Sequence, residues 1–167
     1  MARAALEHLR LQEVVFMPTG VPRYRRPPVA SAGDRVAMLQ LAIAGEPRYS
    51  IDERELAPQA SGYTVDTLRS LRDELGPETA LYLLIGADQL AKFSQWHRPD
   101  EVRQLAKLAV FARPGIGLDA TDVPIIPMPP MPISASEIRA RAARGQDLSD
   151  ALPEAVARYI ARRRPYH

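Results

Sequence analysis

The sequence has no cysteine, so disulfide bonds, thiolate metal sites and a cysteine nucleophile are excluded. Histidine is also scarce, and the spacing of His8, His97 and His167 is not that of a metal-ligand set. Lysine occurs only at Lys92 and Lys107. Arginine therefore carries almost all of the positive charge, and its planar guanidinium suits bidentate contact with phosphate.

Long apolar runs are missing as well. No stretch approaches the roughly 20 residues of a membrane-spanning helix, and residues 1–11 carry charged side chains where a secretory signal would have an apolar core. The formal net charge is only +2, and a nucleic-acid-binding protein would usually show a more basic face. We therefore expect a cytoplasmic protein with no membrane or nucleic-acid partner, built as one domain over residues 1–167.

Short apolar runs alternate with stretches of helical periodicity along the chain. This alternation is typical of an α/β fold with a mostly parallel sheet covered by helices on both faces. In such a sheet, ligands lie beyond the carboxyl ends of the strands. Strands are predicted at residues 14–17, 49–52, 81–85, 108–112 and 123–128, and helices at residues 1–11, 34–44, 64–75, 99–106, 136–144 and 153–163, with a short helix ending at residue 92.

A proline-rich run ends in a helix start that is suited to binding an anion. Residues 124–132 cannot be helical, whereas residues 136–144 can. Ser134 or Ser136 is placed to cap this helix, and a helix start carries outward-pointing N–H groups and partial positive charge. Arg139 follows within about one turn. The pattern therefore indicates an anion site, although an ordinary cap with a surface arginine would have the same sequence.

Other candidate residues follow strands or begin helices. Gly86 ends the most apolar strand and would let the backbone approach a flat ligand. Asp88 could accept hydrogen bonds from a ribose or cap the next helix. Thr64, after Tyr63, reads as a helix cap that could also contact a small acid. Trp96 is the only tryptophan and could pack in the core or stack on an aromatic ring.

Several familiar catalytic motifs are excluded. Residues 115–120 match the relaxed Gly-x-Gly-x-x-Ala dinucleotide fingerprint, but this fingerprint must open a helix, and the prolines that follow prevent one. The sequence has no Gly-x-x-x-x-Gly-Lys-Ser/Thr phosphate loop and no serine in a nucleophile elbow. No metal site is indicated, and nothing indicates covalent catalysis.

Taken together, six stretches resemble bacterial nicotinate-nucleotide adenylyltransferases, of the nucleotidyltransferase α/β family. Each match is short, but their order and spacing along the chain are specific. The resemblance implies a Rossmann-like, doubly wound sheet. The matching stretches are Arg35 with Met38 and Leu39, residues 62–68, residues 84–88, Trp96 with His97, residues 112–115 and residues 133–139.

The resemblance implies a reaction in which ATP and nicotinate mononucleotide give nicotinate adenine dinucleotide and pyrophosphate. The phosphate of the mononucleotide would attack the α-phosphorus of ATP, so the protein would position two anions and stabilise charge. Magnesium would arrive with ATP, and an oligomer is possible. The implied ATP-binding residues are Gly86, Asp88, Arg113, Ile133, Ser134, Ser136 and Arg139, and the implied residues for the nicotinate substrate are Tyr63, Thr64, Trp96 and His97.

The sequence departs from the family pattern at its beginning. The family opens with a strand and a His-x-Gly-His motif that faces the ATP phosphates, and neither is present. Residues 1–8 resemble the middle of the helix that normally follows, so we expect an N-terminally incomplete domain that lacks its first strand and leaves strand edges unpaired. The catalytic residues are therefore unassigned.

Two explanations of this departure stay open. The natural protein starts upstream of Met1, or the chain is short and inactive. Two alternative functions also stay open: a related adenylyltransferase that acts on another phosphate substrate, and a nucleotide-binding remnant without catalysis.

Overall fold

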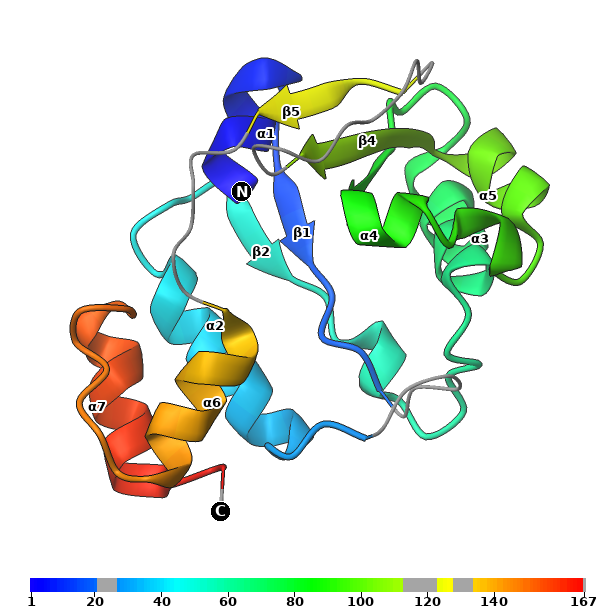
Figure 1. The fold of residues 1–167 in the computed structure, drawn as a ribbon. Helices are drawn as coiled ribbons and strands as arrows, with labels where there is room; N and C mark the ends of the chain where they lie inside the picture. The colour runs from blue at the N-terminus through cyan, green and yellow to red at the C-terminus, as the bar shows by residue number, and fades with distance from the viewer. Residues whose placement is uncertain (21–26, 113–122, 128–133, 167) are drawn as a thin grey trace. The chain divides into compact units, whose positions relative to one another are not determined.

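The computed structural model describes residues 1–20, 27–112, 123–127 and 134–166. The chain divides into two compact units, each built from two segments (Figure 1). The first, called here the β3 unit, comprises Met1–Gln12 and Ser61–Pro130. The second, called the β1 unit, comprises Glu13–Ala60 and Met131–His167. Whether they act as the single domain expected over residues 1–167 stays a prediction.

The β3 unit contains a parallel sheet of three strands in the order β3-β4-β5. The buried core of the unit forms where β4 and β3 meet the helices, and Ile85, Val102 and Val110 are at most 6% exposed. β4 is buried along most of its length, as expected for a central parallel strand. The elements of this unit are α1 (Ala2–His8), α3 (Thr64–Leu75), β3 (Tyr82–Gly86), α4 (Ala87–Leu90), η2 (Phe93–Gln95), α5 (Pro99–Leu105), β4 (Lys107–Ala112) and β5 (Ile125–Pro127).

Helix boundaries in the β3 unit follow ordinary sequence signals. α3 ends at Gly76, whose φ of 79° suits a residue without a Cβ. α5 begins with Pro99 and carries two acidic residues in its first turn, which favours a helix start. α1 has no side-chain cap at Met1. α3 and α5 lie side by side (Figure 1).

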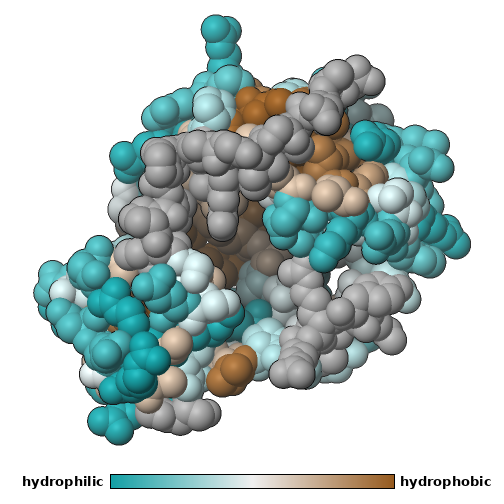
Figure 2. Space-filling view, viewed as in Figure 1, coloured by the Kyte–Doolittle hydropathy of each residue, from teal (hydrophilic) through white to brown (hydrophobic). Residues whose placement is uncertain are grey.

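The β1 unit pairs two parallel strands, β1 and β2, with three longer helices. A small buried cluster of Ala142, Leu148, Val156 and Ile160 holds α6 and α7 together. The surface over these two helices is mostly hydrophilic (Figure 2). The elements are β1 (Val14–Phe16), α2 (Ala32–Ile43), β2 (Tyr49–Ile51), η1 (Arg54–Leu56), α6 (Ala135–Ala143) and α7 (Glu154–Arg163).

All described strand pairs are parallel, so the predicted α/β class with parallel strands is confirmed. The described strands nevertheless form two sheets instead of one. Within the described residues, β1 pairs only with β2 and β3 pairs only with β4, so each has one edge without a strand partner. Val15, in the middle of β1, is 42% exposed, in line with the expected unpaired edge.

None of the helices in the described part of the chain combines the length and the apolar character needed to cross a membrane.

Candidate active site

The first turn of α6 has the features that the sequence predicted for an anion site. Ser134 is the N-cap, and its Oγ accepts a hydrogen bond of 3.1 Å from the backbone N–H of Glu137. This assigns the cap to Ser134, the first of the two candidate serines. Arg139 donates from Nη2 to the Oγ of Ser136 at 3.1 Å. Both Ser136 and Arg139 are exposed, so a hydroxyl and a guanidinium are held together at a helix start that faces solvent.

Tyr63 and His97 are brought together in the β3 unit. Their rings stack with centroids 4.2 Å apart and an interplanar angle of 30°. Tyr63 is partly buried and precedes α3, whereas His97 is exposed and precedes α5. Two of the residues expected to hold the nicotinate substrate therefore contact each other directly.

Trp96 precedes His97 in the sequence and packs on the core. Its ring is tilted by 43° against that of Phe93, with centroids 5.2 Å apart. Phe93 is 3% exposed, and Arg103 lies over its ring at 4.9 Å. Trp96 is itself only partly buried. Part of the indole is therefore used for packing on Phe93. The two roles considered for Trp96, packing in the core and stacking on an aromatic ring, do not exclude each other.

Thr64 differs from its prediction as a helix cap. Tyr63 occupies the N-cap position, Thr64 is the first helical residue, and the N-cap makes no side-chain capping bond. The Thr64 side chain is partly buried. The expectation failed because a threonine before a helix is typical of both the N-cap and the N1 position, and only backbone angles separate them.

Gly86 and Asp88 form a close local arrangement at the carboxyl end of β3. A Cβ on residue 86 would lie 2.6 Å from the Oδ1 of Asp88, so a side chain there would displace the Asp88 carboxylate from the strand end. Asp88 also accepts a hydrogen bond from the side chain of Gln89 at 2.9 Å. Gly86, and not Asp88, occupies the N-cap position of α4. The carboxylate of Asp88 is therefore not used to cap that helix.

An ion-pair network links the two helices that carry Tyr63 and His97 at their starts. Arg69 of α3 makes a bidentate pair with Glu101 of α5, with N–O distances of 2.6 and 2.8 Å. Arg69 also contacts Asp66 at 2.7 Å. The hydrogen bond from Arg69, assisted by Arg98, lowers the pKa of the Glu101 carboxyl. This network joins α3 to α5, and no pattern in the sequence predicted it.

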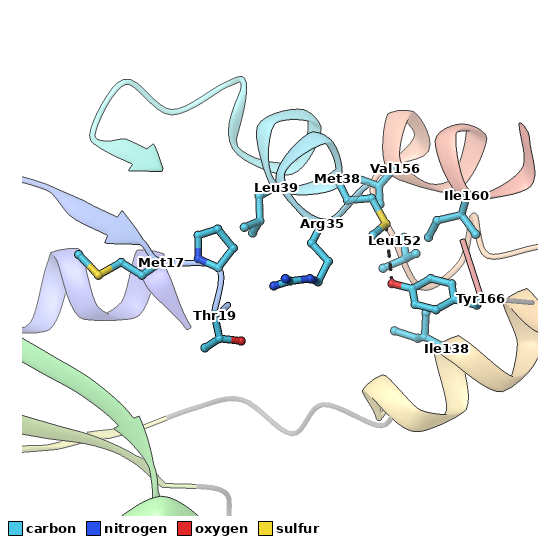
Figure 3. Close-up of a pocket in the computed structure, with 11 residues that line it drawn as sticks. Met17, Thr19, Arg35, Met38, Leu39, Ile138, Leu152, Val156, Ile160 and Tyr166 are labelled. Atoms are coloured by element: carbon cyan, nitrogen blue, oxygen red, sulfur yellow. Dashed lines mark hydrogen bonds between the residues drawn. The ribbon is translucent and has the colours of Figure 1, made fainter. Parts of the chain in front are cut away.

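A pocket of about 430 Å³ opens in the β1 unit beside the end of β1. Figure 3 shows the Arg35 side chain extending from α2 into this pocket, with Thr19 on one side and Ile138 and Tyr166 on the other. The Nε atom of Arg35 is buried and has no hydrogen-bond partner among the described residues. The lining is completed by Met17, Pro18, Met38, Leu39, Leu152, Val156 and Ile160.

Sequence reasoning matched Arg35 to the family pattern but assigned it no role, and it missed Tyr166 entirely. A signal that could have assigned Arg35 a role is its spacing of three and four residues before Met38 and Leu39, which places these side chains on one side of α2. Ser31 is the N-cap of α2 and accepts a hydrogen bond from the N–H of Asp34 at 3.1 Å. Tyr166 follows the end of α7, and no sequence pattern places it beside Met38.

The predicted site residues are divided between the two units. Ser134, Ser136 and Arg139 belong to the β1 unit, whereas the remaining described candidates, Tyr63, Thr64, Gly86, Asp88, Trp96 and His97, belong to the β3 unit. Arg113 and Ile133, which the sequence also assigned to ATP binding, lie outside the described residues. In the described ranges, no group of three or more His, Asp or Glu side chains is arranged to hold a metal ion.

The class of protein follows from the fold. The chain is similar to a solved structure of Plasmodium falciparum nicotinic acid mononucleotide adenylyltransferase complexed with NaAD, with a TM-score of 0.75 and 17% identity, over 93% of this chain and 83% of that chain. At this identity the likeness shows the fold alone, which is that of a Rossmann-like α/β nucleotidyltransferase.

The sequence comparisons then give the family. Residues 1–141 match the cytidylyltransferase-like family, and the chain belongs to it. A "Probable nicotinate-nucleotide adenylyltransferase" of Laribacter hongkongensis is 44% identical over 189 residues, covering 99% of this chain and 86% of the relative. One of Bordetella petrii is 42% identical over 175 residues, covering 97% and 87%. The resemblance inferred from the six short stretches is confirmed.

Proposed function

We propose that this chain transfers the adenylyl group of ATP to nicotinate mononucleotide, giving nicotinate adenine dinucleotide and pyrophosphate. The observation that carries the proposal is the 44% identity to a probable nicotinate-nucleotide adenylyltransferase over nearly the whole chain. The serine-capped start of α6, with Arg139 held beside Ser136, is chemically suited to the phosphates of such a reaction. The product would serve NAD biosynthesis.

The chemistry needs no nucleophile from the protein. The phosphate oxygen of nicotinate mononucleotide attacks the α-phosphorus of ATP, and the bond from this phosphorus to the bridging oxygen breaks as pyrophosphate leaves. Charge develops on the transferring and leaving phosphates, so donors aimed at these oxygens lower the barrier. Arg139, Ser136 and the free N–H groups of α6 are the donors proposed here, and Arg113 and Ile133 are proposed to bind ATP with them.

The remaining assignments concern the two ring systems. Gly86 and Asp88 are proposed to contact the adenosine, with the Asp88 carboxylate accepting from a ribose hydroxyl. Tyr63, Thr64, Trp96 and His97 are proposed to contact the nicotinate end. The stacked pair of Tyr63 and His97 and the half-exposed indole of Trp96 support this assignment, because aromatic surfaces favour offset or tilted contact with a flat ring.

Magnesium is proposed to act as part of the ATP substrate. Magnesium is commonly held by phosphate oxygens, a few carboxylates and water, and not by a cage of protein ligands. The described residues offer no gathered carboxylate set that would hold it alone. When bound, the ion would neutralise charge on the pyrophosphate as it leaves.

The proposal is tested by pyrophosphate release from this 167-residue chain with ATP, magnesium and nicotinate mononucleotide. Parallel reactions replace the mononucleotide with nicotinamide mononucleotide or with phosphopantetheine. The same reactions are run on a longer chain that adds the residues encoded upstream of Met1. Circular dichroism confirms that each chain is folded.

Pyrophosphate release that requires nicotinate mononucleotide, in either chain, supports the proposed reaction. Release that is faster with another phosphate substrate favours a related adenylyltransferase instead. ATP binding without turnover in both folded chains would contradict the proposal and favour a nucleotide-binding remnant.

A further inference from the structure

A guanidinium reaches into the pocket of the β1 unit (Figure 3). It belongs to Arg35 of α2, and its buried Nε has no acceptor among the described residues. A buried N–H without a hydrogen bond costs free energy, and a guanidinium costs more than a neutral donor. Such a group is expected to be satisfied by a ligand that brings an anionic acceptor.

The pocket adjoins the anion site at the start of α6. Ile138, which lines the pocket, lies in the first turns of α6, one residue before Arg139 and four after the cap at Ser134. A helix rises about 1.5 Å per residue, so the capped turn and the pocket wall are separated by roughly 6 Å along α6. An extended anion of more than one phosphate is of the right size to contact both.

A second arginine, Arg139, is the neighbour in sequence of the lining residue Ile138. Tyr166 lines the pocket, and burial raises the pKa of the Tyr166 hydroxyl, while the nearby positive charges of Arg139 and Arg35 oppose that rise and Asp34 adds to it. Arg139 is not itself a lining residue, but it follows the lining residue Ile138 on α6, and its guanidinium is held beside the Oγ of Ser136 at the helix start. A single carboxylate needs one guanidinium, whereas two guanidinium groups beside a helix start suit a polyphosphate.

The rest of the lining is mostly apolar. Met38, Leu152, Val156 and Ile160 line the pocket with Tyr166, and they belong to or pack against the buried cluster of the unit. Apolar walls lower the local dielectric, which strengthens the attraction between a phosphate and a guanidinium. The polar end of the pocket is formed by Arg35 and Thr19, which follows β1, where parallel sheets usually bind ligands.

We propose that Arg35 is a phosphate-binding residue and that this pocket holds the β- and γ-phosphates of ATP, which leave as pyrophosphate, together with Arg139. The proposal rests on the proposed function for the identity of ATP, and it adds a binding residue and a subsite to it. Arg35 holds the leaving group, whereas it makes no contact with the adenosine or the nicotinate.

Isothermal titration with three ligands separates this role from others. The ligands are inorganic pyrophosphate, ATP and AMP, each with magnesium and without nicotinate mononucleotide. The variants are Arg35→Gln, which removes the charge, and Arg35→Lys, which keeps the charge but loses the planar fork. Arg162→Gln, an exposed position on α7 outside the pocket, removes an equal charge and serves as the matched control.

We expect Arg35→Gln to weaken pyrophosphate and ATP binding by about tenfold or more, as loss of a charged hydrogen bond does. Arg35→Lys should lose less, and Arg162→Gln should change binding by less than about twofold. AMP binding should be unchanged in all three variants, because AMP lacks the β- and γ-phosphates. Thermal melting shows that each variant is folded, and Arg35→Lys carries the test if Arg35→Gln does not fold.

Equal pyrophosphate affinity in the original chain and in folded Arg35→Lys and Arg35→Gln would overturn the proposal, as would an equal loss of AMP binding or no pyrophosphate binding by the original chain. The outcome is independent of turnover. Pyrophosphate binding that depends on Arg35, in a chain that does not convert nicotinate mononucleotide, would sustain the subsite and refute the proposed reaction.

Discussion

The two compact units position their candidate residues by different means. In the β3 unit, a three-stranded sheet and a large apolar core support aromatic side chains, and Trp96 packs on the buried Phe93. In the β1 unit, the buried cluster between α6 and α7 has four members among the described residues, and polar contacts supplement it. Tyr159 donates to Asp34 at 2.8 Å, and Arg141 pairs with Asp150 at 2.6 Å.

This difference matches the chemistry proposed for each unit. A flat ring is bound best by rigid apolar and aromatic surface, which a deep core can support. Phosphates need donors and positive charge, which stay accessible when the core is small and charged side chains lie on the surface. The β1 unit accordingly leaves Ser136 and Arg139 exposed, and it leaves Arg35 lining a pocket.

The largest expected effect tests the core of the β3 unit. Phe93→Ala removes a nearly buried ring that contacts Trp96 and Arg103. We expect a loss of about 3–5 kcal/mol in the free energy of unfolding, as for other buried phenylalanines. Urea unfolding followed by the fluorescence of Trp96 measures it. Leu75→Ala, at a position 49% exposed, is the control and should cost less than about 1 kcal/mol; equal losses would mean that Phe93 does not support this core.

The next effect tests the anion site of the β1 unit. Arg139→Ala should lower turnover by about tenfold or more, because a donor to the charge that develops on phosphate is lost. Steady-state kinetics in whichever chain is active measures it. Arg144→Ala, at the other end of α6, removes the same charge and should retain turnover within about twofold. Turnover unchanged by Arg139→Ala would exclude this residue from the mechanism.

A smaller effect separates the cap of α6 from its ligand-binding hydroxyl. Ser134→Ala should cost about 1 kcal/mol of stability, since the bond to the N–H of Glu137 is lost. Ser136→Ala should stay within about 0.5 kcal/mol, because this hydroxyl does not cap the helix. Chemical denaturation compares the two. The reverse order of losses would show that Ser136 is the cap in solution.

The smallest effect concerns the polar contacts of α2 and α7. Hydrogen bonds from Ser31 and Tyr159 lower the pKa of the Asp34 carboxyl. A carboxyl whose pKa is lower in the folded state stabilises the fold above its unfolded value of 3.8, and this contribution is lost as the pH falls through the folded pKa. Thermal melts of the original chain and Asp34→Asn should therefore differ at pH 6 and converge as the pH falls below 3.8 and through the lowered pKa of Asp34. A difference in melting temperature that does not change with pH would show that titration of Asp34 does not contribute to the loss of stability in acid.

Much of the fold could be predicted because it depends on local patterns. The strand at 81–85 was found from its apolar run, and the helix at 64–75 was found from its periodicity and the glycine at its end; both agree with β3 and α3 within one residue. The helix of residues 136–144 was one residue late at each end, because two serines offered competing caps. The prediction of Thr64 as a cap was wrong for a similar reason.

The contacts between distant side chains could not be predicted. The pair of Arg69 and Glu101 joins residues 32 positions apart, and the bond of Tyr166 to Met38 joins residues 128 positions apart. The periodicity of a helix or strand carries no information about contacts between residues so far apart in the sequence. The sequence predicted only that Tyr63 and His97 belong to the same substrate site. Their direct ring contact depends on the packing of α3 against α5.

By itself, the sequence determined the α/β class, the order of elements, the family and the helix start that carries Ser134 and Arg139, because each depends on residues close together in the chain. Only the tertiary structure decided that Arg35 and Tyr166 line one pocket and that the Arg35 Nε is buried without an acceptor among the described residues. Burial and hydrogen-bond satisfaction are properties of packed elements, and a linear pattern contains neither.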